Sequence, residues 1–293
     1  MYDIIIIGAG PAGMTAALYA ARANKKILIL EASNYGGQII NASHITNYPV
    51  EEDISGYDFA SKLYNQIINH GVEIRLEKVL NINKNKEIET DKSIYKAKAI
   101  IIATGLKHRK LNLPAEEELI GKGISYCATC DGAFFKDKNV AVVGGGNTAL
   151  EDSLYLSDIC NKVYLIHRRD SFRGDPITIE KVLNKSNIEI IYNSNITKLN
   201  GISNLESIVL NNNKTIDING LFVAIGQEPN TEYLNNIIEI DANGYIKSNE
   251  LCHTNIDGIF VAGDIRDKSL RQLVTATSDG AIAATEAIKY INE

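Results

Sequence analysis

Residues 2–13 of the chain read YDIIIIGAGPAG, and residues 14–23 continue as a run of small, helix-forming side chains. The apolar run at 2–7 is short and rich in β-branched residues, which predicts a buried parallel strand. The glycines that follow it allow a tight turn between this strand and the helix. A strand, the pattern G-x-G-x-x-G and a helix in this order predict a turn that binds a dinucleotide pyrophosphate at the helix N-terminus.

The residues after this turn supply a second part of a nucleotide site. An expected strand at 26–30 ends at Glu31, 18 residues after Gly13, which suits a carboxylate that binds a ribose hydroxyl. A chance glycine turn beside a surface glutamate is the alternative, and the joint presence of strand, helix and acid disfavours it. The loops at 36–38 (GGQ) and 47–49 (NYP) are either plain turns or places where the backbone approaches the ligand.

A second nucleotide turn occurs in the middle of the chain. An expected strand at 140–143 runs into GGGNTA at 144–149, which opens a helix. The next strand ends at HRR, residues 167–169, with Arg173 four residues further on. Positive charge at this place fits a 2′-phosphate, so the site should take NADP(H) in preference to NAD(H). A solvated basic loop is the alternative.

The two halves of the sequence repeat one pattern. IIATG at 101–105 follows the first turn and FVAIG at 222–226 follows the second, which indicates one nucleotide-binding architecture used twice. The late strand GIFVAGD at 258–264 should rejoin the first sheet. The expected fold is therefore α/β, with two Rossmann-like three-layer domains, the second inserted into the first. The expected boundaries place residues 1–114 and 239–293 in the first domain and 115–238 in the second.

Between the two turns lies CATCD, residues 127–131. Two cysteines at this spacing can close a disulfide that cycles between oxidised and reduced forms. A zinc site is a weaker interpretation of this pair, because zinc needs four ligands. Neither the isolated Cys160 and Cys252 nor the five histidines supply a second pair of ligands. Asp131 is either the acid that protonates an outgoing thiolate or the N-cap of a helix.

These parts together define an electron path. A nicotinamide gives up a hydride, a disulfide accepts two electrons, and a flavin connects the two reactions. Two nucleotide sites and one C-x-x-C pair therefore imply FAD and NADP(H). The arginine-rich site is the one for NADP(H), so FAD is expected at the first turn.

Composition restricts the class of protein further. The chain has 293 residues, of which 45% are hydrophobic, and a net charge of −6, which argues against a nucleic-acid partner. No apolar run approaches the roughly 20 residues that span a bilayer, and no signal peptide is visible, so we expect no membrane association and a cytoplasmic location. With only four cysteines in a reducing compartment, a close pair is more often catalytic than structural.

Taken in order, these motifs resemble the bacterial low-molecular-weight thioredoxin reductases. The resemblance rests on GAGPAG at 8–13, CATCDG at 127–132, GGGNTA at 144–149, HRRDSFR at 167–173 and the late GD…RQ segment, and it covers nearly all of the chain. It implies a homodimeric FAD flavoprotein of the disulfide reductase family. The implied activity is NADPH-dependent reduction of the disulfide of thioredoxin, a protein substrate.

The resemblance also implies roles for individual residues. Cys130 would face the flavin, Cys127 would be the interchange thiol that attacks thioredoxin, and Asp131 would be the acid and base. The expected flavin site comprises Gly8, Gly10, Pro11, Ala12, Gly13, Glu31, Gly36, Gly37, Gln38, Asn47, Ala103, Thr104, Gly105, Gly263, Asp264, Arg271, Gln272 and Leu273. The expected NADPH site comprises Gly146, Asn147, Thr148, His167, Arg168, Arg169, Arg173 and Ile225.

Three positions depart from the usual pattern of these reductases. Val50 stands where glycine is usual, Gly174 where alanine is commoner, and Ser278 where glycine precedes the aspartate. Two other functions remain as alternatives: a relative with another electron donor or acceptor, such as a ferredoxin-fed reductase or a dithiol oxidase, and a flavoprotein that only binds nucleotides. The intact arginine loop disfavours the first, and the CATCD stretch disfavours the second.

Overall fold

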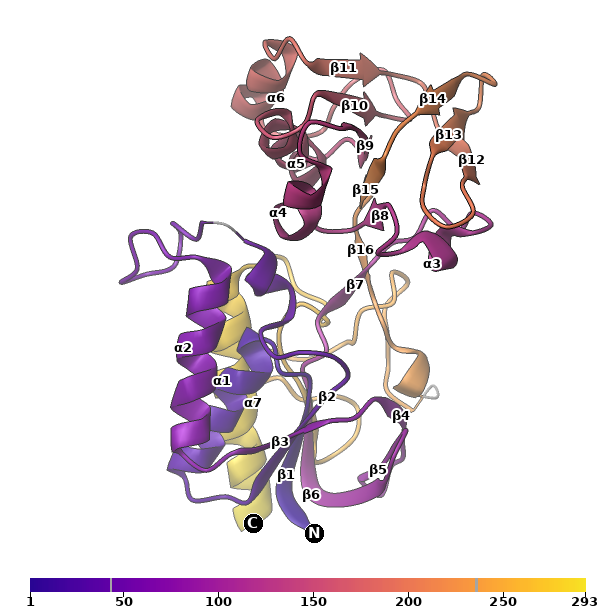
Figure 1. Cartoon of the computed structure of the whole chain (residues 1–293). Helices are drawn as coiled ribbons and strands as arrows, with labels where there is room; N and C mark the ends of the chain where they lie inside the picture. Colours follow the sequence, from indigo (N-terminus) through magenta and orange to yellow (C-terminus); the bar gives the residue numbers. More distant parts are fainter. Residues whose placement is uncertain (43, 235–236) are drawn as a thin grey trace. The chain divides into compact units, whose positions relative to one another are not determined.

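The computed structural model describes residues 1–42, 44–234 and 237–293. The chain forms two compact units, Met1–Lys107 with Glu228–Glu293 and His108–Gln227 (Figure 1). The second unit is thus inserted into the first, and the predicted α/β fold with two nucleotide-binding domains is confirmed. The chain leaves unit 1 in β7 (Leu106–His108) and returns in β16 (Gln227–Pro229), and these two strands pair with each other.

The unit boundaries lie earlier in the chain than residues 114 and 238, where the sequence analysis placed them. Leu111 and Leu113 already pack against the core of unit 2. Leu234 and Ile238 are buried in the core of unit 1. Both changes of unit therefore occur before the expected boundaries.

Unit 1 is built on a seven-stranded sheet in which β1, β2, β3, β6 and β17 run parallel. β4 and β5 extend it as an antiparallel edge beside β6. The strands are β1 (Tyr2–Ile7), β2 (Ile27–Glu31), β3 (Glu73–Leu76), β4 (Val79–Ile82), β5 (Glu87–Thr90), β6 (Ile94–Ile102) and β17 (Ile259–Val261); the helices are α1 (Pro11–Arg22), α2 (Gly56–Asn69) and α7 (Leu273–Asn292), with 3₁₀ turns η1 (Gly37–Asn41) and η3 (Glu232–Leu234).

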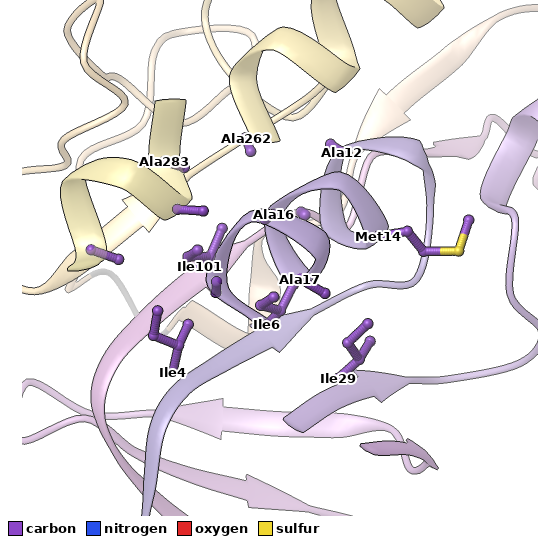
Figure 2. Packing of buried hydrophobic residues seen from close by; sticks show 14 of the residues in the cluster. Ile4, Ile6, Ala12, Met14, Ala16, Ala17, Ile29, Ile101, Ala262 and Ala283 are labelled. Carbon is purple, nitrogen blue, oxygen red and sulfur yellow. The ribbon is translucent and has the colours of Figure 1, made fainter. Parts of the chain in front are cut away.

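The isoleucine run of β1 is buried on both faces of this sheet. Ile4 and Ile6 pack against the helices, whereas Ile5 and Ile7 belong to the core on the opposite face. A parallel strand covered on both sides has no solvent face, which explains the absence of alternating polar residues. Figure 2 shows Ile4, Ile6 and Ile101 beneath the small residues of α1, with Ala283 of α7 nearby.

Helices α1 and α7 pack closely because alanines and one glycine line their interface. Gly280 of α7 is buried, and a Cβ built on it would overlap the carbonyl oxygen of Ala12. Since this oxygen belongs to the first turn of α1, Gly280 determines how closely α7 approaches the dinucleotide turn.

We expect Gly280→Ala to lower the free energy of unfolding by about 2–3 kcal/mol, because the added methyl group forces the two helices apart. Helix propensity alone would favour alanine by about 1 kcal/mol, so the sign of the change separates the two effects. Denaturant unfolding of the holoprotein measures it, with the exposed Ser278→Ala as the control expected to stay within about 0.5 kcal/mol. A Gly280→Ala variant as stable as the parent would contradict the close packing.

Unit 2 has a five-stranded parallel sheet in the order β11-β10-β9-β15-β8, with a three-stranded antiparallel sheet on one side. Val140 and Val142 of β9 pack in one core with Leu150 of the helical layer, and Ala141 and Val143 in the other. Its elements are α3 (Glu116–Leu119), β8 (Ile124–Ser125), α4 (Ala128–Asp131), η2 (Gly132–Phe135), β9 (Asn139–Gly144), α5 (Asn147–Ser157), β10 (Lys162–Ile166), α6 (Pro176–Leu183), β11 (Ile188–Ile191), β12 (Ile196–Asn200), β13 (Ser207–Leu210), β14 (Thr215–Asp217) and β15 (Gly220–Ala224).

Within the described residues, no helix combines the length and the apolar character that crossing a membrane requires.

Candidate active site

The first glycine turn joins β1 to α1 in the geometry that the sequence predicts. Gly8 has a φ of +105°, and a Cβ at this position would overlap the carbonyl oxygen of Ala103. A Cβ on Gly13 would overlap the carbonyl oxygen of Gly8. Gly10 is the N-cap of α1 and offers no side chain to cap it. The N–H groups of the first turn of α1 are thus left for an anionic ligand.

Glu31 lies beside this turn, at the end of β2. Its Oε2 accepts a hydrogen bond from the backbone N–H of Ala9 at 2.8 Å, and its Oε1 accepts one from Ser33 N–H at 2.9 Å. The Gly36 N–H donates to the Ala9 carbonyl at 2.8 Å, which brings the GGQ loop against the same turn. The GGQ loop therefore lies next to the turn at which the pyrophosphate is expected.

A cavity opens at the carboxyl end of β1 and β2, lined by Gly8, Glu31 and Thr104 among the predicted residues and by Lys78, Val79 and Tyr233 in addition. The Tyr233 hydroxyl lies 3.2 Å from Thr104 Oγ1, and burial raises the pKa of this phenol, so it stays neutral. Sequence reasoning missed these three additional residues, because the loop, strand and 3₁₀ segments that carry them contain no ligand motif.

The last part of unit 1 contacts the first glycine turn. Gly263 follows β17 with a φ of +80°, and a Cβ on it would lie 2.9 Å from the Ala12 side chain. Oδ1 of the next residue, Asp264, is buried and accepts no hydrogen bond from the described residues; Lys268 Nζ is 3.6 Å away. Burial raises the pKa of the Asp264 carboxyl, and the charges of Lys268 and Arg271 oppose this shift. An orphaned buried acceptor fits a hydroxyl donor from a bound ligand.

Arg271 and Gln272 are held in place by residues far away in the sequence. The Arg271 guanidinium lies 3.8 Å from the centre of the Tyr245 ring, and its Nε donates to the Asp264 carbonyl at 3.2 Å. Asn47 Nδ2 donates to Gln272 Oε1 at 3.1 Å. The NYP loop is therefore tied to the start of α7, where Leu273 begins the helix.

The second glycine turn joins β9 to α5, with Gly146 as the uncapped N-cap residue of the helix. His167 is buried, and a Cβ on Gly145 would overlap its ring. The Arg173 N–H donates to the Gly145 carbonyl at 2.8 Å, so the loop after β10 folds onto the turn. Asn147, the first residue of α5, accepts through its side-chain oxygen from the N–H of Asp175 at 2.7 Å.

The arginines of this loop are exposed next to the turn. Arg168, Arg169 and Arg173 all point out of the core, and neither Arg168 nor Arg173 forms an ion pair within the described part of the chain. Ala224 ends β15 directly before Ile225, and its carbonyl oxygen lies against Gly144, so Ile225 is adjacent to the same turn. His167 differs from the arginines, because its ring packs under the turn and its Nε2 lies 3.0 Å from the Ser171 carbonyl.

Cys127 and Cys130 form a disulfide with a Cα–Cα distance of 5.4 Å. Cys127 is the N-cap residue of the short helix α4 and is half-buried, whereas Cys130 is exposed. The Cys130 N–H donates to Cys127 Sγ at 3.2 Å, and Thr129 Oγ1 lies 3.4 Å from the same sulfur. Within unit 2 the pair thus lies at the surface, where a reductant or an acceptor can reach it.

Asp131 is not used as a capping residue. It precedes η2, but its side chain accepts no capping hydrogen bond there. Its Oδ2 instead accepts a hydrogen bond from Ser125 Oγ at 2.6 Å. The helix-cap alternative from the sequence analysis is therefore not realised, and the carboxylate is placed beside the disulfide.

The other two cysteines, Cys160 and Cys252, are buried and unreactive. Burial raises the pKa of the Cys160 thiol to about 11, and burial likewise raises the pKa of the Cys252 thiol to about 11. Few of these side chains are thiolates near neutral pH, and the thiolate is the nucleophile.

The structure gives a local reason for only one of the three departures, Gly174. Val50 is fully exposed with a φ of +80°, a left-handed conformation that favours glycine. A Cβ on Gly174 would overlap the Leu150 side chain, so glycine suits this chain at that position. Nothing in the structure explains Ser278, which is exposed on α7.

The sequence profile of the pyridine nucleotide-disulphide oxidoreductases matches residues 2–280. The chain therefore belongs to this family. Within the family it lies among the thioredoxin reductases. It is 42% identical over 302 residues to the thioredoxin reductase of Listeria monocytogenes, covering 100% of this chain and 95% of the relative. For the thioredoxin reductase of Bacillus subtilis the identity is 39%, with 100% and 96% covered.

A solved structure agrees with this placement. The crystal structure of Lactococcus lactis thioredoxin reductase matches with a TM-score of 0.89 and 38% identity, covering 100% of this chain and 99% of that chain. The resemblance stated from the motifs is thereby confirmed, as is the class of enzyme, a flavin- and pyridine nucleotide-dependent disulfide reductase.

Proposed function

We propose that the protein reduces the disulfide of thioredoxin with electrons from NADPH, by way of FAD and the Cys127–Cys130 pair. The observation that carries the proposal is the disulfide at the surface of unit 2, in a chain with two complete nucleotide turns. A protein that only binds nucleotides has no use for the Cys-x-x-Cys pair. A neighbouring aromatic ring supports a protein acceptor, since Phe134 is 74% exposed four residues after Cys130.

FAD is assigned to unit 1. Glu31 and the open N-terminus of α1 suit a ribose and a pyrophosphate. The orphaned Oδ1 of Asp264 suits a hydroxyl of the ligand, and the positive charge of Arg271 lies nearby. When bound, the flavin accepts a hydride from a nicotinamide and passes two electrons to a disulfide.

NADPH is assigned to unit 2. Arg168 and Arg173 are exposed beside the turn and suit a 2′-phosphate, which forked guanidinium donors bind well. A carboxylate at this place, as in unit 1, would repel that phosphate. This loop favours NADPH over both NADH and a ferredoxin donor.

The redox residues divide the work of disulfide exchange. The enzyme dithiol loses two electrons and two protons to the disulfide of thioredoxin, and the Cys127–Cys130 bond re-forms. Asp131 gives a proton to the thiolate that leaves thioredoxin and takes one from the second enzyme thiol. The resemblance names Cys127 as the interchange thiol, but Cys130 is the more exposed residue in the structure. Trapping of the mixed disulfide with thioredoxin decides between the two cysteines.

We also propose a homodimer in the cytoplasm. The motif resemblance supports the dimer, and the two unpaired, buried cysteines suit a reducing compartment. Light scattering of the holoprotein should give twice the mass of the chain, and a mass of one chain would contradict the dimer.

The proposed electron path predicts a distinct spectroscopic result. We expect anaerobic NADPH to bleach the flavin absorbance at far lower concentration than NADH, and oxidised thioredoxin to restore it. The reason is that only NADPH carries a 2′-phosphate that the arginine loop can bind. Oxidised thioredoxin then accepts the electrons of the reduced flavin through the Cys127–Cys130 disulfide. Bleaching that thioredoxin cannot reverse would contradict the acceptor, and no bleaching by either nucleotide would contradict the NADPH site.

A further inference from the structure

Ser125 is a buried residue at the end of β8, two positions before Cys127, and the sequence analysis assigned it no role. Its hydroxyl lies between the two ends of the redox loop. Oγ donates to Asp131 Oδ2 at 2.6 Å and accepts a hydrogen bond from Cys127 N–H at 3.0 Å. The Cys127 carbonyl is a second possible acceptor at 3.2 Å, but the single hydroxyl proton favours the shorter contact to a carboxylate.

The position of Ser125 is determined by the sheet rather than by the loop. β8 is an edge strand that pairs in parallel with β15, where Ser125 is in register with Phe222. β8 leads into α4 (Figure 1), which begins at Ala128, three residues after Ser125. The Asp131 N–H donates to the Cys127 carbonyl at 3.2 Å, so residues 125–131 form a closed loop with the serine hydroxyl at its centre.

This arrangement treats the two carboxylate oxygens of Asp131 differently. Oδ2 is engaged by Ser125, whereas Oδ1 accepts no hydrogen bond from any residue in the described ranges. A carboxylate held by one oxygen has a restricted orientation and keeps its other oxygen available for proton exchange.

We propose that Ser125 is the positioning residue for Asp131 in disulfide exchange. It holds the carboxylate through Oδ2 beside the cysteine pair, and Oδ1 exchanges the proton with the thiols. The inference rests on the proposed function, because it needs Asp131 to act as the acid and base of that reaction. No further reactant enters, since the proton that Asp131 gives to the thioredoxin thiolate returns from the second enzyme thiol.

A purely structural role is the competing explanation, since the same hydroxyl also receives the Cys127 N–H. The two roles predict different effects of a Ser125 substitution once Asp131 has also been replaced. If Ser125 acts through the carboxylate, its removal has no further effect once Asp131 is asparagine. If it only supports the turn, the two effects multiply.

The experiment compares Ser125→Ala, Ser125→Thr, Asp131→Asn and the Ser125→Ala/Asp131→Asn pair, each as the flavin-loaded protein. Rapid mixing of prereduced enzyme with oxidised thioredoxin gives the rate of dithiol oxidation, and mixing of oxidised enzyme with NADPH gives the rate of flavin bleaching. We expect Ser125→Ala to slow thioredoxin reduction by about tenfold, as for the loss of a hydrogen bond to a charged group, with bleaching unchanged. Ser125→Thr, which keeps the hydroxyl, should recover most of the rate.

The Ser125→Ala/Asp131→Asn double variant should reduce thioredoxin at the rate of the Asp131→Asn variant alone. A Ser125→Ala protein as fast as the parent, beside a slow Asp131→Asn, would overturn the inference and leave the proposed function intact. A double variant in which the two losses of rate multiply would also overturn the inference. A fast Asp131→Asn would remove the acid role itself, and the inference with it. Flavin content and melting temperature check that each variant is folded, and Ser125→Thr serves as the second test if Ser125→Ala is not.

Discussion

Replacement of either Cys127 or Cys130 by serine is expected to lower the rate of thioredoxin reduction by at least about 1,000-fold, because a hydroxyl neither attacks nor re-forms a disulfide. Flavin bleaching by NADPH should stay within about twofold of the parent rate, since that step does not use the sulfurs. Steady-state turnover with thioredoxin and stopped-flow bleaching measure the two steps separately. Turnover that survives either substitution would refute the role of the pair.

The two serine variants also show which of the two cysteines attacks the disulfide of thioredoxin. The variant that keeps the attacking thiol should form a stable mixed disulfide with thioredoxin, visible as one band on a non-reducing gel. A band with Cys127→Ser would identify Cys130 as the attacking residue, in line with its exposure. A band with Cys130→Ser would identify Cys127, as the motif resemblance implies. Cys160→Ser is the matched control, because burial raises the pKa of that thiol to about 11.

Replacement of Arg168 and Arg173 together by alanine should raise the KM for NADPH by at least about 100-fold, with little change for NADH. Each guanidinium contact to a phosphate contributes about 1.5–3 kcal/mol. NADH has no 2′-phosphate, so its binding does not depend on these contacts. The ratio of kcat/KM for the two nucleotides, measured by flavin bleaching, gives the result directly. Equal losses for NADPH and NADH would show that the loop supports the fold rather than reading the phosphate.

A matched charge change controls for long-range electrostatics. Lys181 is exposed near the end of α6, a few residues beyond the arginine loop, and Lys181→Ala also removes one positive charge from unit 2. This variant should keep the preference for NADPH within about twofold, because Lys181 is not part of the arginine loop and salt screens the field of an exposed charge. A large loss in Lys181→Ala would point to the overall field of the unit rather than to the two arginines.

Several features were readable from the sequence because they are local. The strand at 2–7, the glycine turn and the start of α1 follow one another without interruption, so their residue types alone predict the geometry. The same holds for β9 and α5. The spacing of Cys127 and Cys130 is sufficient for a disulfide once the loop closes into α4.

Other features needed the folded chain. The sequence leaves open whether the loop at residue 47 is a plain turn or approaches a ligand, and only the folded chain shows that Asn47 donates to Gln272, 225 residues away. Tyr233 joins Thr104 across 129 residues, over the whole inserted unit. No local pattern marks either partner, because each side chain is also common in solvated loops.

The sequence by itself therefore determined the class of fold, both nucleotide turns and the redox pair, since glycine conformations, β-branched runs and cysteine spacing act over a few residues. Only the tertiary structure decided where one unit ends and the next begins, and that Asp131 is held by Ser125 rather than capping a helix. The orphaned oxygen of Asp264 became visible only there as well. The physical reason is that burial and hydrogen-bond partners depend on which distant segments pack together, and this is set by the whole core.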